Sequence, residues 1–181
     1  MNELSEYVTD VNAEIARKSI ACFSTIAIRL PKMAKTVAGH LRNFISLQIS
    51  YVTTETLKAL KNILRRYPDF IEDFIPFINP KLALEVQDVD GKVALCWLLG
   101  MFGHYIEDAP YMLEKMIEDI KELQSAELSQ VLLAATFRLF FKRAPETKKI
   151  LANVFQEIMV NCMDSHVKQR AVFLFRLLKS D

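Results

Sequence analysis

Residues 93–103 read VALCWLLGMFG, eleven residues that carry no charge and include the only tryptophan of the chain. A helix needs about 20 apolar residues to span a bilayer, so this stretch is too short to cross a membrane. It also lacks the polar stripe that a surface helix turns to water. Other parts of the protein must therefore cover it on several sides, and the surrounding sequence indicates how.

Four prolines mark a regular alternation of helices. Pro31, Pro68, Pro110 and Pro145 each follow a hydrophobic helical stretch, and they are separated by 37, 42 and 35 residues. Proline is well tolerated in the first turn of a helix, because its missing N–H would have no partner there. Helix, tight turn with proline and helix, repeated at about 40 residues, is typical of HEAT and armadillo solenoids.

The spacing of apolar residues predicts helices throughout and no sheet. Asp69 with Glu72 predicts a capping box, and Asp90 and Asp108 are further candidate caps. Pro76 is expected to end or kink the helix that contains it. The predicted helices cover about 11–30, 31–45, 52–64, 70–78, 91–103, 112–120, 126–143, 146–162 and the residues from 164 onward, with a short turn at 82–86.

We therefore predict an all-α fold, a right-handed α-solenoid of about four to five helix pairs, with residues 1–181 as a single segment. In a solenoid a first-layer helix touches the repeats on both sides and its own second-layer partner. This arrangement accounts for the apolar stretch 93–103, including Trp97 as a core residue. It predicts equally deep burial for the helices at 126–143 and 167–178.

The second-layer helices keep polar faces. The exposed candidates for binding a protein partner are Arg42 in one helix and Glu114, Lys115 and Glu118 in another. Contact with solvent is enough to explain the presence of any one of these charges. The prediction therefore concerns the polar helix faces on which they lie and not any single residue. Reversing their charges should abolish partner binding if the face is correct.

Composition excludes several classes of protein. Hydrophobic residues make up 51% of the chain and charged residues 25%, unlike disordered or membrane proteins. The formal net charge of +1 gives no general attraction for nucleic acid or acidic membranes. The first residues lack the hydrophobic core of a secretory signal. Cys22, Cys96 and Cys162 are expected to be buried free thiols in a reducing compartment.

The sequence contains no arrangement of residues that predicts catalysis. His40, His104 and His166 fall in different helices, and no nucleophile or phosphate-binding motif is present. In the DVDG stretch at 88–91, a calcium loop with Gly91 in sixth place would put Val86 and Trp97 at positions that require carboxylates. We therefore expect no enzyme activity, no cofactor, no metal site and no small-molecule substrate.

Two further features have alternative explanations. Gly100 and Gly103 lie inside a helical pattern, where they indicate either close packing of a neighbouring helix or a hinge. The basic stretch LKNILRR at 60–66 fits a helix C-terminus, which favours cations, or a contact with membrane phosphates. Close packing and a solvated helix end are the simpler interpretations.

Several segments resemble the trunk of beta-adaptins, the large beta subunits of the heterotetrameric adaptor complexes of vesicle transport. The resemblance covers essentially the whole chain in one order, and the stretch GKVALCWLLG followed by APYMLE is most similar to the beta subunit of the fourth adaptor complex. The stretch at 80–91 departs from the family pattern. The matching segments are ELSEYVTDVN at 3–12, RKSI at 17–20, ISYVTTETLKALKNILRRYP at 49–68, GKVALCWLLGMFGHYIEDAPYMLE at 91–114, RLFFKRAPETKKIL at 138–151 and VKQRAVFLFRLLKSD at 167–181.

The resemblance implies a non-enzymatic α-solenoid scaffold for intracellular protein transport. It implies binding to a medium-type chain and to the second large adaptor subunit, without nucleic acid. It also implies a cytoplasmic protein, peripheral at trans-Golgi or endosomal membranes and coated vesicles. The chain would be the later part of the trunk, without the first repeats, the hinge and the ear. Cut ends of a solenoid expose apolar surface, so any self-association of this piece is expected to be artificial.

Two other functions are compatible with parts of the pattern. A coatomer large subunit, or another HEAT-repeat scaffold such as a nuclear transport receptor, would share the solenoid. The mixed charges of the second-layer helices argue against an acidic inner face for basic cargo. An all-helical enzyme would need titratable groups that converge in a pocket, and the scattered histidines offer none.

Overall fold

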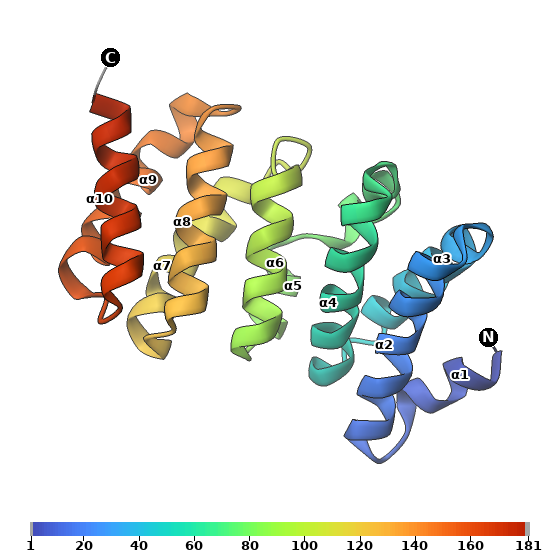
Figure 1. Cartoon of the computed structure of the whole chain (residues 1–181). Coiled ribbons are helices and arrows are strands. Elements are labelled where there is room, and N and C mark those ends of the chain that lie inside the picture. The colour runs from blue at the N-terminus through green and yellow to red at the C-terminus, as the bar shows by residue number, and fades with distance from the viewer. Residues whose placement is uncertain (1, 180–181) are drawn as a thin grey trace. The chain divides into compact units, whose positions relative to one another are not determined.

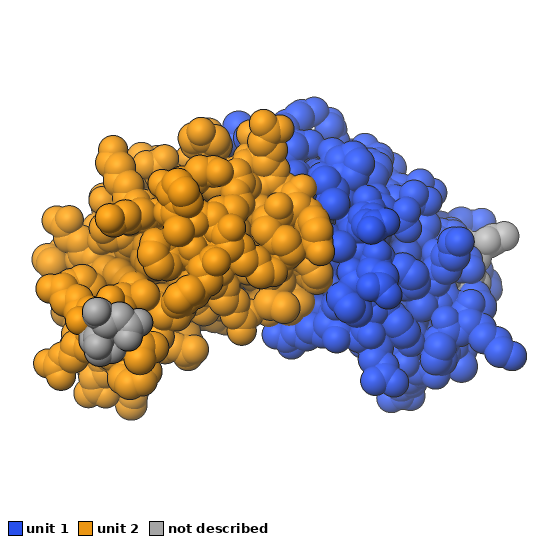
Figure 2. Space-filling model, turned by 90° about the horizontal axis from the view of Figure 1, so that it is seen from above, with its two compact units in different colours: residues 1–94 blue, residues 95–181 orange. Residues whose placement is uncertain are grey.

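The computed structural model describes residues 2–179, and every regular element in that range is a helix (Figure 1). The prediction of an all-α fold built from helix pairs is confirmed. The chain divides into two compact units, residues 1–94 and 95–181, which Figure 2 colours separately. No helix in the described range is both long enough and apolar enough to cross a membrane.

The first unit contains two layers. Helices α2 and α4 pack side by side, α3 packs against both, and the 3-10 segments η3 and η4 lie against α3. Phe23, Leu41 and Leu60 are fully buried between these layers. The elements are α1 Asn2–Glu6, η1 Tyr7–Thr9, α2 Ala13–Arg29, η2 Pro31–Met33, α3 Ala34–Ser46, α4 Ser50–Arg66, η3 Pro68–Asp73, η4 Ile75–Phe77, α5 Pro80–Glu85 and the start of α6 Val89–Phe102.

The second unit repeats the arrangement. Helix α8 packs against α7, α9 and α10, and α7 packs against α9 (Figure 1). The second-layer helices are α7 and α9, and their buried faces include Met112, Ile117 and Ile158. The elements are the rest of α6, α7 Ala109–Leu123, α8 Ala126–Phe140, α9 Ala144–Asn161 and α10 Ser165–Lys179.

All four repeat prolines open a helical segment, as predicted. Pro31 and Pro68 begin the 3-10 segments η2 and η3, whereas Pro110 and Pro145 lie in the first turns of α7 and α9. A proline at these positions removes no hydrogen bond, because the first N–H groups of a helix have no partner within the helix. The sequence period therefore marks real helix starts.

The capping predictions at Asp69 and Asp108 were wrong. Residues 68–77 form two 3-10 segments instead of one α-helix, and no side chain caps the first of them. Pro76 removes a main-chain donor from this stretch, which favours short turns over a continuous helix. Asp108 precedes α7, but its side chain accepts no capping hydrogen bond.

Burial of the apolar helices differs from the prediction at three places, one of which is Phe141 in the stretch 126–143, where the side chain is 65% exposed. Leu95, Cys96 and Leu98 on α6 are fully buried, as expected, but Trp97 is only partly buried. In α10 the residues Phe173 and Leu177 are 64% and 51% exposed, so the prediction of deep burial for 167–178 was wrong. In the described part of the chain, α10 packs against α8 and α9 on one side only.

The glycines of α6 and its C-terminal turn allow close packing. A Cβ atom on Gly100 would lie 2.6 Å from the Ala135 Cα of α8. One on Gly103 would lie 3.0 Å from the Ala109 Cβ and 3.2 Å from the Leu139 Cδ1. The close-packing interpretation is confirmed for Gly100, whereas at Gly103 the atom nearest to an added Cβ is the main-chain oxygen of Leu99 in α6 itself, at 2.2 Å.

The cysteines do not share one environment. Cys96 is fully buried, and this burial raises the pKa of its thiol far above the ordinary value. Cys22 is exposed and Cys162 is partly exposed, so the prediction of three buried thiols was wrong. Cys22 lies on the solvent-facing side of α2.

Candidate partner-binding site

Three of the four predicted partner-binding residues lie together on α7. Glu114, Lys115 and Glu118 are all exposed, and none of them forms an ion pair with another described residue. The opposite face of the helix is buried through Leu113, Met116 and other apolar residues. Positions separated by three and four residues share one side of a helix. These three charges therefore form one solvent-facing surface.

Arg42 occupies a different environment in the first unit. It lies on α3, where its Nη1 is 3.6 Å from Asp73 Oδ1 of η3. Both side chains remain nearly half exposed, and a surface ion pair of this kind contributes only about 0–1 kcal/mol. The structure therefore gives Arg42 an intramolecular partner, and Arg42 belongs to the first unit whereas the α7 residues belong to the second.

Helix α9 extends the exposed surface of α7. The Lys121 Nζ of α7 is 3.5 Å from the Glu157 Oε2 of α9, and Asn161 Nδ2 donates to Glu157 Oε1 at 2.9 Å.

Tyr111 on α7 is 65% exposed, one turn before Glu114 and Lys115. Sequence analysis missed this residue, although its spacing of three and four from the charged positions is visible in the sequence.

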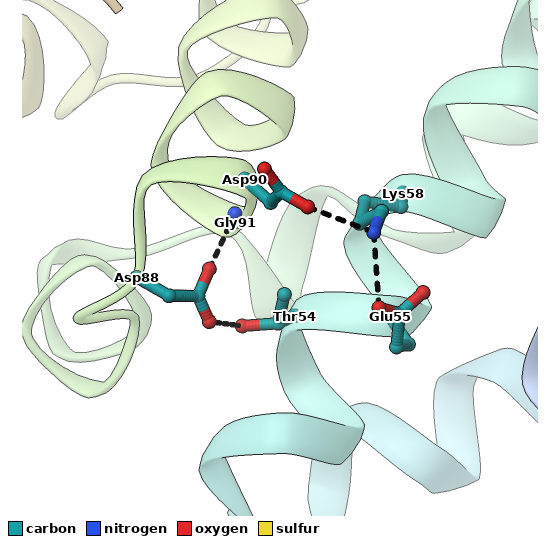
Figure 3. A network of polar contacts seen from close by, with 6 residues as sticks. All are labelled: Thr54, Glu55, Lys58, Asp88, Asp90 and Gly91. Atoms are coloured by element: carbon teal, nitrogen blue, oxygen red, sulfur yellow. Dashed lines mark hydrogen bonds and ion pairs between the residues drawn. The ribbon is translucent and has the colours of Figure 1, made fainter. Parts of the chain in front are cut away.

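A polar network joins α4 to the start of α6 (Figure 3). Asp88 accepts a short hydrogen bond from the Thr54 hydroxyl, and its Oδ1 accepts the main-chain N–H of Gly91 at 2.6 Å. Asp88 is thus the cap of α6, whereas the sequence suggested Asp90. A Cβ atom on Gly91 would lie 2.5 Å from Val86 Cγ1 and 2.8 Å from Thr54 Oγ1, so this junction requires a glycine.

Asp90 instead binds Lys58, as Figure 3 shows. The Lys58 Nζ lies 3.0 Å from both Asp90 Oδ2 and Glu55 Oε1. Partial burial alone would lower the pKa of Lys58, but the hydrogen bonds to Glu55 and Asp90 raise it above its ordinary value. The carboxylates of the DVDG stretch are therefore engaged by protein donors and act as structural groups.

Two of the three histidines, His40 and His104, lie against aromatic rings. The His40 ring packs 5.3 Å from the Phe23 ring, and the His104 ring lies 3.9 Å from the Tyr105 ring. Partial burial and the nearby Lys142 ammonium lower the pKa of His104. Among residues 2–179, no three histidine, cysteine or carboxylate side chains come together as possible metal ligands.

Comparison with known proteins finds beta subunits of adaptor complexes and a beta-adaptin-like protein among the relatives of this chain. The chain is 37% identical over 183 residues to Beta-adaptin-like protein A of Arabidopsis thaliana, an alignment that covers 100% of this chain and 21% of that protein. It is 29% identical to AP-4 complex subunit beta-1 of Mus musculus, with 98% of this chain and 24% of that protein covered. It is 26% identical to AP-1 complex subunit beta-1 of Homo sapiens, with 99% and 19% covered.

The chain thus spans about a fifth of the length of the curated relatives that it matches. The family described as Adaptin N terminal region matches residues 1–181. This match includes α7 with its exposed charges, the capped start of α6 and all four repeat prolines. Because it covers every residue of the sequence, the chain belongs to the family of adaptin N-terminal regions.

Proposed function

We propose that this chain is a non-enzymatic scaffold segment of the beta subunit of a vesicle-coat adaptor complex. In that role it would hold other adaptor subunits during intracellular membrane protein transport, at trans-Golgi or endosomal membranes. The observation that supports this role most directly is the match of the whole chain to the adaptin N-terminal region. The named beta subunits of AP-1 and AP-4 complexes among its relatives support the same assignment.

We further propose that the partner is a medium-type adaptor chain, and that it binds the exposed face of α7. Glu114, Lys115 and Glu118 offer charges of both signs on a rigid helix, and Tyr111 adds an exposed aromatic ring. Mixed charges fix the register of an interface, and aromatic residues contribute much of its binding energy. Arg42 is a second proposed contact, in competition with its own ion pair to Asp73.

The finer assignment to the fourth adaptor complex is also a proposal. It is supported by the stretch GKVALCWLLG followed by APYMLE, at 91–100 and 109–114. Identities of 29% to an AP-4 beta subunit and 26% to an AP-1 beta subunit do not separate these complexes. Preferential binding to the medium chain of the fourth complex, over that of the first, would decide the matter.

The experiment is co-expression of the chain with the longin-like N-terminal domain of a medium chain, followed by co-purification and titration. The variant Glu114→Lys/Lys115→Glu/Glu118→Lys should weaken the complex at least about tenfold, which corresponds to about 1.4 kcal/mol. The matched control is Glu14→Lys/Lys18→Glu, an exposed pair on the first-layer helix α2. Equal affinity of both variants and the native chain would refute the α7 face.

Arg42 requires a separate comparison because of Asp73. The variant Arg42→Asp/Asp73→Arg retains an opposite-charge pair but reverses the charge presented at position 42. Weaker binding by this variant would assign Arg42 to the interface. Unchanged binding would leave it as an intramolecular contact only. If no medium chain from any adaptor complex co-purifies, the proposed partner is wrong for this chain.

A further inference from the structure

Two cations at the end of α8 have no carboxylate partner in the described range. Arg138 and Lys142 are four residues apart, and both side chains are exposed. Neither of them forms an ion pair with any of residues 2–179. A helix C-terminus favours a cation, but two like charges at this spacing repel each other. Helix stability alone therefore does not explain the pair, which has the charge to hold an anion.

The contacts that these cations do form are weak. The Arg138 Nη1 lies 2.8 Å from the Met101 Sδ of α6, and a thioether sulfur is a poor acceptor. The Lys142 Nζ lies 3.2 Å from the His104 Nδ1 and 3.3 Å from its Nε2, so it is shared between them and aligned with neither lone pair. An anion can therefore replace both contacts without breaking an ion pair.

Arg143 holds the turn after α6 against the end of α8, at the upper end of the second unit in Figure 1. Its guanidinium donates to three main-chain oxygens of this turn and pairs with Glu146. His104, which lies in the turn, is therefore kept beside Lys142. A surface that is ordered before binding loses less conformational entropy when a partner docks. The three acceptors are the oxygens of Gly103 at 3.2 Å, Ile106 at 2.8 Å and Glu107 at 3.2 Å.

Two exposed aromatic rings adjoin this contact in the sequence. Tyr105, which follows His104, is 59% exposed, and Phe141, which precedes Lys142, is 65% exposed. The Phe141 ring packs edge-on against the Phe137 ring, with 5.1 Å between their centroids. Aromatic residues and arginine are enriched where proteins bind each other. We call the surface formed by His104, Tyr105, Arg138, Phe141 and Lys142 the α6–α8 corner.

Acidic residues limit the extent of positive charge at the α6–α8 corner. Glu107 and Asp108 are exposed directly after the turn residues His104 and Tyr105. A flat anionic membrane or a nucleic acid would meet these carboxylates together with the cations, and the net charge of +1 adds no wider attraction. A narrow polypeptide segment, in contrast, can place its own carboxylates on the two cations alone.

We propose that the α6–α8 corner binds a short acidic segment of a partner protein, in which two carboxylates lie next to an aromatic or large apolar side chain. One carboxylate accepts two parallel hydrogen bonds from the Arg138 guanidinium, a geometry that arginine favours, and the second binds the Lys142 ammonium. The apolar side chain of the partner lies against Tyr105 or Phe141. The inference depends neither on the adaptor role nor on the α7 face.

The test uses the 181-residue chain and a phage-displayed library of random 12-residue peptides, first depleted on the variant Arg138→Gln/Lys142→Gln. Peptides that survive the depletion and bind the native chain are synthesised with blocked ends and titrated by fluorescence polarisation. They should carry two carboxylates next to an aromatic or large apolar residue. Their affinity should fall at least about tenfold with Arg138→Gln and with Tyr105→Ser/Phe141→Ser, and Arg138→Lys should restore part of it.

Matched variants control for net charge and for folding. Lys148→Gln/Lys149→Gln removes two exposed cations from α9 in the same unit and should leave the affinity unchanged. Glu114→Lys/Lys115→Glu/Glu118→Lys should also leave it unchanged, which separates this surface from the α7 face. Because all these side chains are at the surface, Tm should stay within about 3 °C of the native value.

Three results with peptides would overturn the proposal: no peptide survives the depletion, the surviving peptides are poor in carboxylates, or Lys148→Gln/Lys149→Gln weakens binding as much as Arg138→Gln does. Vesicles of equal parts phosphatidylcholine and phosphatidylserine test the membrane alternative by co-sedimentation. The chain should not bind them through this surface. Vesicle binding that is lost in Arg138→Gln/Lys142→Gln would assign the α6–α8 corner to anionic lipid and overturn the proposal as well.

Discussion

At the scale of single residues, the four glycines have different local environments. Gly91 and Gly100 lie where another part of the chain approaches the helix so closely that a Cβ atom would overlap it. Gly39, in the middle of α3, has no atom within 4 Å of the position that a Cβ would take. The same residue type therefore serves close packing at two positions and weakens a helix at a third.

Gly100→Ala should destabilise the protein by about 1–3 kcal/mol, the usual cost of forcing extra volume into a packed interior. The added Cβ would lie 2.6 Å from the Ala135 Cα, and main chain cannot move aside as a flexible side chain can. The measurement is urea unfolding followed by circular dichroism.

Gly39→Ala is the matched substitution. It should stabilise α3 by about 0.5–1 kcal/mol, because alanine loses less conformational entropy in a helix and meets no neighbour here. Opposite shifts of the two urea midpoints are expected. If both variants shifted the midpoint in the same direction, the close contact between α6 and α8 would not be the reason for a glycine at position 100.

At the scale of helices and turns, two aspartates two residues apart have different tasks. Asp88 caps α6 and accepts the hydroxyl of the buried Thr54, whereas Asp90 forms an exposed ion pair with Lys58. Caps and buried hydrogen bonds contribute more to stability than exposed ion pairs do. The free energies of unfolding of variants at Asp88 and Asp90 can show which of the two residues contributes more to stability.

Asp88→Ala should lower the free energy of unfolding by about 1–3 kcal/mol, since it removes a cap and leaves a buried hydroxyl without its acceptor. Asp90→Ala should lower it by less than about 1 kcal/mol, because Lys58 keeps Glu55 as a partner. Thermal unfolding of both variants gives the comparison. A larger loss for Asp90→Ala would mean that the Lys58 pair, and not the cap, fixes the start of α6.

Most helices could be predicted from the sequence because their signals are local. Apolar periodicity and a proline in the first turn were sufficient to find α7 and α9, and continuous apolarity identified α6. The stretch 68–77 could not be predicted correctly, because the cost of Pro76 to an α-helix competes there with the apolar spacing. The exposed face of α7 could be inferred from its charges, and only coordinates could reveal the ion pair of Lys121 with Glu157 on α9.

At the scale of the whole molecule, charge and apolar exposure are distributed unevenly. The net charge is only +1, yet α10 carries Lys168, Arg170, Arg176 and Lys179 and no acidic residue between 165 and 179. Phe173 and Leu177 on the same helix are more than half exposed. This helix therefore presents an apolar surface surrounded by charges of one sign.

Exposed apolar surface on α10 should make the isolated chain self-associate at high protein concentration. In a symmetric dimer the same surface lies on both sides of the interface, so the cations of one copy face those of the other. Salt screens this repulsion, since the Debye length falls from about 30 Å at 0.01 M to about 8 Å at 0.15 M. Sedimentation velocity should therefore show association that strengthens as salt is added.

The variant Phe173→Ser/Leu177→Ser should remain monomeric at every salt concentration, because it removes the apolar contact and keeps all four cations. Tyr111→Ser, which removes an equally exposed aromatic side chain from α7, should associate as the native chain does. Association that weakens with added salt would show that opposite charges drive it, which would place the contact outside the uniformly basic α10. Association unchanged in the double variant would likewise assign the contact to another surface.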